Sequence, residues 1–104
     1  MKIQDVIDAA KKNGYEWVKR RYILYDRNGI LPVAGCVIGQ AAINLNLRFG
    51  RVEEFIDQAL PNAASKITQF NDNEAKSYQE AVDFLEEVLK PVADFERPEI
   101  KEIE

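Results

Sequence analysis

The chain has 104 residues, of which 46% are hydrophobic and 31% are charged, and its formal net charge is −4 at pH 7. This length suits one domain with its own core, and the negative charge argues against binding nucleic acid over the whole surface. The sequence contains no histidine and a single cysteine, Cys36. These counts exclude an internal disulfide, a cysteine-based zinc site and every nucleophile that depends on histidine.

The sequence also indicates where the protein resides. The N-terminus enters a charged amphipathic pattern directly, which is not the pattern of a signal peptide. The uncharged run 28–47 is interrupted by glycine, proline and amide residues, so it does not predict a membrane span. We therefore expect a cytoplasmic protein that has no membrane partner.

The first predicted helix spans residues 2–13. Its apolar residues recur at the spacing of one helix face, and they are Ile3, Val6, Ile7 and Ala10. The dipeptide Asn13-Gly14 follows, and glycine directly after the last turn is a common end for a helix.

A small β-hairpin is expected at about residues 18–33. The segment YILY has residue types that favour strands. The next segment, DRNG, is a turn signal, and we take its first and last residues, Asp26 and Gly29, as structural turn residues. The short return strand contains Pro32, which predicts an edge position for that strand. Such a hairpin is not stable alone, so it must pack on helices.

A helix over residues 35–47 is predicted to lie at the centre of the domain. Its sequence, which includes GCVIGQAA, is apolar nearly all round, and helices of this kind are usually buried. Gly35, Gly39 and Ala42 remove side-chain bulk, which would let another element approach closely. Gly39 costs the helix about 1 kcal/mol relative to alanine, and this cost points to a packing reason.

The second half of the chain predicts further helices. Val52, Phe55, Ile56 and Ala59 share a helix face, and a short helical segment begins near Pro61.

The longest apolar stripe of the chain predicts a helix over residues 78–90, which Ser77 opens with a capping box. Residues 71–76 are then the loop before this helix. Asn71 or Asp72 is expected to bond free backbone amides in that turn.

Together these segments predict a mainly α (α+β) fold. Four to five helices surround the central glycine- and alanine-rich helix, against which the helices 2–13 and 78–90 pack, and one small hairpin is added. Residues 1–93 are expected to form a single domain. Residues 94–104 are acidic and poor in apolar residues, so we predict a loosely ordered tail.

Several short motifs occur in a recognisable order. They are an early tryptophan, a D-x-x-G turn, the segment GCVIGQAA, and FND before a capped helix, and the matching positions are Trp17, Asp26, Gly29, Cys36, Gly39, Ala41, Asn71 and Asp72. This order resembles a family of small uncharacterised bacterial and phage proteins, a domain of unknown function, over most of residues 1–89. Two positions depart from its pattern: Gln40 separates the glycine from the alanine, and Phe70 stands where tryptophan is expected. The resemblance implies no catalytic residue.

The best candidate for a binding surface is the basic and aromatic segment before the turn. It contains Trp17, Lys19, Arg20, Arg21 and Tyr22. Basic residues mixed with aromatic ones can hold phosphates and stack on bases. On a strand, however, Lys19 and Arg21 face one side and Arg20 the other. The alternative is a solvated edge strand whose charges block unwanted pairing.

Two other groups of residues raise a chemical hypothesis. Cys36 lies near a helix N-terminus, where a thiolate is stabilised, but no base is evident for it, so a buried small residue is the alternative. Asp26 and Asp72 could complete a pocket with Cys36, provided that the fold brings the three together. The run from Asn71 to Glu74 is too short for a calcium loop, so no metal and no cofactor is expected.

The leading hypothesis is therefore a non-enzymatic interaction or accessory module, of bacterial or phage origin. Its partner would be a protein, including a second copy of the same chain. The first alternative is weak binding of nucleic acid or another acidic partner through the basic hairpin. The second is a small-molecule binder or enzyme that uses Cys36 with Asp26 or Asp72.

Overall fold

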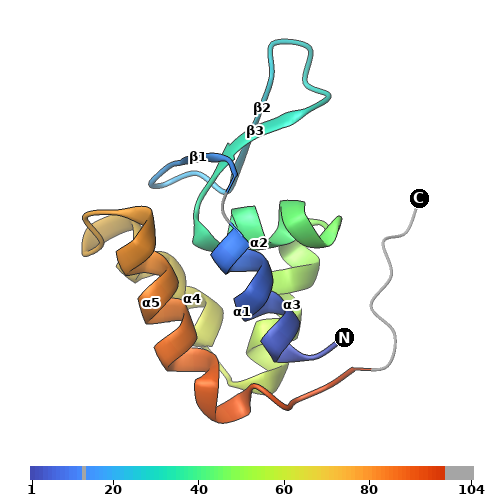
Figure 1. The fold of residues 1–104 in the computed structure, drawn as a ribbon, viewed down its shortest axis with the longest axis vertical. Coiled ribbons are helices and arrows are strands. Elements are labelled where there is room, and N and C mark those ends of the chain that lie inside the picture. The colour runs from blue at the N-terminus through green and yellow to red at the C-terminus, as the bar shows by residue number, and fades with distance from the viewer. Residues whose placement is uncertain (13, 98–104) are drawn as a thin grey trace.

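The computed structural model describes residues 1–12 and 14–97. In chain order its elements are α1 (Ile3–Lys12), β1 (Glu16–Trp17), β2 (Ile23–Tyr25), β3 (Pro32–Gly35), α2 (Val37–Leu45), α3 (Phe49–Ala59), α4 (Ala63–Asn73), α5 (Tyr78–Leu89) and the 3-10 turn η1 (Lys90–Val92). The helices form one body, and the strands lie at one end of it (Figure 1). The fold is mainly helical α+β, which confirms the predicted class.

Helix α2 lies in the middle of the helical body, as its composition predicts. Its residues from Val37 to Ala42 are all buried, and α1, α3, α4 and α5 each pack against it. The helix is shorter at both ends than the predicted 35–47. Cys36 is its N-cap, and Asn46 ends it in the left-handed conformation with φ 58°.

The strands form a three-stranded sheet in the order β1-β3-β2. β2 pairs with β3 in antiparallel register, with Leu24 opposite Ala34, and β1 pairs with β3 in parallel. The prediction that Pro32 places its strand at an edge is wrong, because β3 is the central strand. Proline is tolerated there because it is the first residue of β3, and β1 pairs only with Ala34 and Gly35.

The sheet is held to α2 by close backbone contacts. A Cβ added at Gly39 would lie 2.0 Å from the carbonyl oxygen of Tyr22, so the chain before β2 can approach α2 only where a glycine stands. The backbone amide of Cys36 donates to the same carbonyl at 3.1 Å. The side-chain amide of Gln40 donates to the carbonyls of Gly35 and Glu16. The predicted packing role of Gly39 is confirmed, and the element that approaches it is the start of the hairpin.

The start of α5 follows its capping signal. The Ser77 hydroxyl accepts a hydrogen bond from the Glu80 amide at 3.2 Å, and the Glu80 carboxylate accepts one from the Lys76 amide. The prediction of a loop over 71–76 is wrong in its first half, because α4 continues through Asn73. The helix continues because Asn71 and Asp72 bond distant segments instead of competing for the backbone of their own turn.

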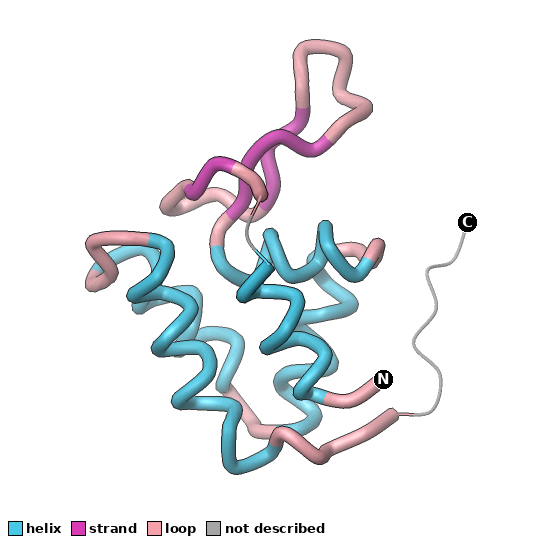
Figure 2. Tube along the Cα trace, in the orientation of Figure 1, coloured by secondary structure: helices cyan, strands magenta, loops and turns pink. Residues whose placement is uncertain are grey.

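The core joins all five helices. Its largest fully buried side chain is Phe55 of α3, and the other large apolar side chains at the same depth are Ile3, Ile7, Ile38, Ile56, Ile67, Leu85 and Leu89. The strands lie at one end of the helical body (Figure 2), where Ala34 is buried and Trp17 and Ile23 pack against the core while partly buried. The hairpin therefore contributes few side chains to the core, and most of its large apolar side chains are exposed to solvent.

The two ends of the described chain lie side by side. The Ile3 amide donates to the Phe95 carbonyl at 2.9 Å, the Arg97 amide donates to the Met1 carbonyl, and Lys2 and Glu96 form an antiparallel bridge. The predicted loose tail from residue 94 therefore does not include residues 94–97, whose backbone is hydrogen-bonded to the N-terminus. The rest of that prediction, residues 98–104, lies outside the described residues.

Candidate functional site

The hairpin formed by β2, β3 and their connection carries the exposed apolar surface of the protein. In the part of the chain that the structure describes, five large hydrophobic side chains are more than 40% exposed. Four lie on this hairpin, Ile30 71%, Leu31 63%, Tyr25 53% and Val33 47%, and the fifth, Tyr22 58%, directly precedes β2. The hairpin projects away from the helical body (Figure 1). These side chains therefore gather on a protrusion and are not scattered over the surface.

Asp26 shapes the tip of this hairpin. Its carboxylate accepts hydrogen bonds from the Asn28 amide at 3.1 Å and the Ile30 amide at 3.0 Å. These backbone hydrogen bonds, the one from Ile30 foremost, lower the pKa of Asp26. Gly29 has φ 71°, which the turn requires. The Asp26 carboxylate thus holds the turn that presents Ile30 and Leu31.

The basic residues of the predicted binding segment do not lie on a strand. Lys19, Arg20 and Arg21 are in the connection between β1 and β2, so the predicted alternation of their side chains across a strand is wrong. Arg20 takes φ 60°, and its amide donates to the Asp72 carboxylate at 2.8 Å. This hydrogen bond anchors the connection to α4, and Lys19, Arg20 and Arg21 are all exposed.

Trp17 is partly buried and packs against the core, so only part of its side chain belongs to the surface. Its indole nitrogen donates to the side-chain oxygen of Asn71 at 2.8 Å, and the Lys19 ammonium lies 5.3 Å from the centre of its ring. A base that stacked on this face of the ring would have to displace Lys19. Tyr22, the other aromatic residue of the predicted surface, stacks on Phe49 of α3 with ring centres 4.2 Å apart and remains exposed.

Asn71 is a fully buried hub that joins three segments. Its side-chain oxygen accepts from Trp17 and from the Val37 amide, the latter at 3.1 Å. Its side-chain nitrogen donates to the Val18 carbonyl at 3.2 Å and to the Asp72 carboxylate at 3.0 Å. Every polar group of the Asn71 side chain is engaged within the fold, so it has none left for a ligand.

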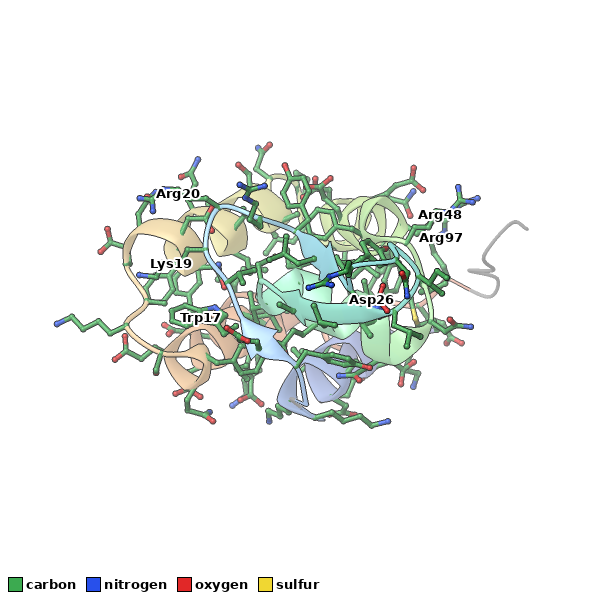
Figure 3. The ribbon with its side chains drawn as sticks, turned by 90° about the horizontal axis from the view of Figure 1, so that it is seen from above. Trp17, Lys19, Arg20, Asp26, Arg48 and Arg97 are labelled. Atoms are coloured by element: carbon green, nitrogen blue, oxygen red, sulfur yellow. The ribbon has the colours of Figure 1, made fainter. Side chains whose placement is uncertain are left out.

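The structure does not bring Asp26 together with Cys36 and Asp72. Asp26 bonds the residues of the projecting turn, whereas Cys36 begins α2 at the opposite end of β3, roughly 16 Å further along the strand. In Figure 3, Asp26 lies on the other side of the sheet from Trp17, Lys19 and Arg20. No group of three or more acidic or cysteine side chains within residues 1–12 and 14–97 is placed to hold a metal ion.

Cys36 is buried, and its sulfur accepts a hydrogen bond from the Gly39 amide at 3.3 Å. Burial raises the pKa of the thiol from 9.0 to about 11.

We expect Cys36 to resist a thiol reagent at about pH 8, because the reactive thiolate is scarce well below the pKa of the thiol. Colour development with a disulfide reagent should be slow for the folded protein and complete in denaturant. Its rate should rise as the pH approaches 11. A rate in the folded state equal to that of a free cysteine would contradict this assignment.

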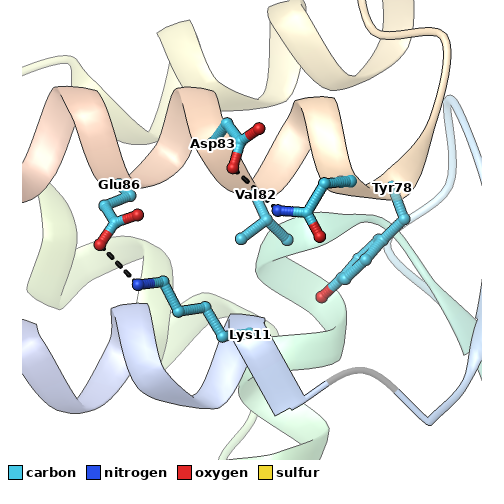
Figure 4. Close-up of a pocket in the computed structure, with 6 residues that line it drawn as sticks. Lys11, Tyr78, Val82, Asp83 and Glu86 are labelled. Atoms are coloured by element: carbon cyan, nitrogen blue, oxygen red, sulfur yellow. Dashed lines mark hydrogen bonds and ion pairs between the residues drawn. The ribbon is translucent and has the colours of Figure 1, made fainter.

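A polar cleft lies between α1 and α5 (Figure 4). Its charged and amide groups are already paired: Lys11 with Glu86 at 2.6 Å, and Gln79 with Asp83 at 2.8 Å. The Tyr78 hydroxyl donates to the Ala10 carbonyl. The cleft therefore joins two helices and presents no unengaged acid, base or nucleophile.

Comparisons with protein-family models, with curated proteins and with solved structures found no match to this chain. No helix in the described part of the chain has both the length and the apolar character that crossing a membrane requires.

The apolar part of the hairpin surface was missed by sequence reasoning. Sequence analysis assigns Ile30, Leu31 and Val33 to a return strand and does not name them as binding residues; the aromatic residues that it adds to the candidate surface are those before the turn, Tyr22 and Tyr25 among them. The available signal was the apolar run directly after the DRNG turn. Residues that directly follow the tight turn of a projecting hairpin lie away from the helices, so no helix covers their apolar side chains.

Proposed function

We propose that this protein is a non-enzymatic interaction module that binds a partner protein through its projecting hairpin. The observation that carries the proposal is that four of the five exposed large hydrophobic side chains of the described chain lie on this hairpin, and the fifth, Tyr22, directly precedes it. An apolar protrusion contributes little to folding, since its side chains remain in water. Contiguous exposed apolar surface is typical of sites that bind another protein.

The charges of the hairpin indicate what kind of partner it fits. The hairpin itself carries Arg27 and Asp26, and the connection that leads into it adds Lys19, Arg20 and Arg21. Residues 18–33 thus contain four of the chain's 14 basic residues and one of its 18 acidic residues. That single carboxylate is engaged with the amides of the turn. A partner surface that combines apolar side chains with carboxylates would therefore complement the hairpin.

A double substitution of the tip tests the proposal. Ile30→Ser with Leu31→Ser removes two apolar side chains that make no contribution to the core. Recovery of a partner from an extract of the native host should fall by at least about tenfold, because central apolar anchors carry most of the binding energy. The recovered protein is quantified by mass spectrometry, and circular dichroism checks that the fold is kept.

The matched control is Lys12→Ser with Lys90→Ser, which shortens two exposed side chains outside the hairpin. This control should retain the partner. Equal recovery with the tip variant and the wild type would refute the proposal.

Nucleic acid is the second candidate partner, since Lys19, Arg20 and Arg21 are consecutive and exposed. Binding of nucleic acid predicts a gel shift at low salt that weakens as the salt concentration rises. The shift should disappear in the variant Lys19→Glu/Arg21→Glu. Protein binding through the apolar tip predicts no such shift. The cover of Lys19 over the Trp17 ring favours the protein partner, because it blocks the ring face that a base would use.

A further inference from the structure

A second surface of the protein combines exposed aromatic side chains with acidic ones, so its charge is opposite in sign to that of the basic residues near the hairpin. We call it the aromatic groove, and it lies between α4 and α5, where it is lined by Phe70, Phe84, Glu80, Asp83 and Glu87. The two phenylalanine rings are stacked with centres 4.1 Å apart and planes 3° apart. Both rings are only partly buried, so the groove has an apolar floor that solvent reaches.

The rim of the aromatic groove is acidic. Glu80, Asp83 and Glu87 are exposed, and in the part of the chain that the structure describes none of them forms an ion pair. Glu80 accepts from the Lys76 amide, and Asp83 accepts from the Gln79 side chain; both partners are neutral donors. Lys11, across the α1–α5 cleft, interacts with Asp83 over a longer distance, so the rim keeps most of its negative charge among the described residues.

A ligand for such a groove would combine apolar side chains with cationic ones. The tip of the hairpin has this composition: Ile30 and Leu31 are the most exposed large hydrophobic residues among those that the structure describes, and Arg27 lies in the same turn. Arg21 adds a further exposed charge at the base of the hairpin. The chain thus carries both members of a complementary pair of surfaces.

We infer that the hairpin tip of one copy docks on the aromatic groove of a second copy. Ile30 and Leu31 would cover Phe70 and Phe84, and Arg21 and Arg27 would face the acidic rim. The contact must be between copies, because the hairpin projects away from the helical body and from α4 and α5 (Figure 1). This inference rests on the proposed function, since it uses the same hairpin.

The contact joins two different surfaces, so it is head-to-tail. Two hairpins facing each other would bring like charges together, which disfavours a symmetric dimer made through the tips. A head-to-tail contact produces either a closed ring or a growing chain of copies, according to the rotation between neighbours.

Sedimentation of the full chain over a wide concentration range tests the inference. The average mass of the wild type should rise with concentration and fall when salt is added. The hairpin variant Arg21→Glu/Arg27→Glu and the groove variant Asp83→Lys/Glu87→Lys should each weaken association by at least about tenfold. The control Glu53→Lys/Glu54→Lys, on α3, changes the same number of charges away from the groove and should associate like the wild type.

Mixing the two weakened variants gives the sharpest result. The reversed hairpin of one meets the reversed groove of the other, and the two unchanged surfaces also match. The mixture should therefore regain an average mass above that of either variant alone. A mixture that stays monomeric would overturn the inference.

Failure of this inference is distinguishable from failure of the proposed function. A wild type that stays monomeric at every concentration overturns self-association, while loss of a different captured protein in Ile30→Ser/Leu31→Ser would still support the hairpin as a binding surface. Association that the groove variant leaves unchanged also overturns the inference, because it places the contact elsewhere.

Discussion

Replacement of Asn71 by alanine is expected to lower the free energy of unfolding by roughly 2–6 kcal/mol. The substitution leaves the buried Val37 amide and the partly buried Trp17 indole nitrogen without their acceptor. Each buried donor left without a partner costs about 1–3 kcal/mol. Urea unfolding followed by the fluorescence of Trp17, the single tryptophan of the chain, measures the change.

Two further variants make the role of Asn71 specific. Asn71→Asp keeps an oxygen acceptor for both donors but loses the hydrogen bond to the Val18 carbonyl and adds a buried charge, so it should also destabilise the protein. Asn73→Ala removes an exposed side chain of the same type, whose one hydrogen bond is a 3.4 Å contact with Arg20. This control should change stability by less than about 0.5 kcal/mol. Equal stability of Asn71→Ala and Asn73→Ala would contradict the hub.

Replacement of Gly39 by alanine should destabilise the protein although alanine favours helices. The added methyl group would lie 2.0 Å from the Tyr22 carbonyl oxygen and 3.0 Å from its carbon, which are backbone atoms that cannot rotate away. The hairpin must move off α2, and overpacking of this kind costs about 1–3 kcal/mol or more. The gain in helix propensity, about 1 kcal/mol, does not offset it.

Gly50→Ala is the matched control, because Gly50 also lies within a helix, but an added methyl group there would have no atom of another element within 4 Å. This variant should be more stable than the wild type by about 0.5–1 kcal/mol. The two glycine-to-alanine substitutions therefore have opposite expected signs. Thermal unfolding by circular dichroism measures both, and stabilisation by Gly39→Ala would show that the hairpin is not seated on α2.

The helices were largely predictable because their signals are local. The stripes that begin at Ile3 and Tyr78 place α1 and α5 within a few residues of their observed bounds, and Ser77 sits at the cap. Helix α2 is apolar on nearly all sides, and this composition predicts its central position. In each case a helix period and a stop signal lie within one short segment, so no distant residue is needed to read them.

The sheet and the site were less predictable because they depend on distant partners. β1 is two residues long and has no period of its own, and it exists because β3 offers a free edge beside it. Asn71 reads as a turn former in sequence, and only the fold brings Trp17, Val18 and Val37 to it. The same holds for the aromatic groove, whose two rings come from separate helices.

The sequence by itself determined that this is a mainly helical domain with a central helix of small residues and a turn at Asp26. It also excluded every reaction that requires a histidine side chain of this chain. The tertiary structure alone decided which polar residues are buried, which apolar ones stay in water, and which charges face each other across separate elements. The reason is physical: helix period and turn preference act between near neighbours, whereas burial and exposure are set by which distant segments pack together.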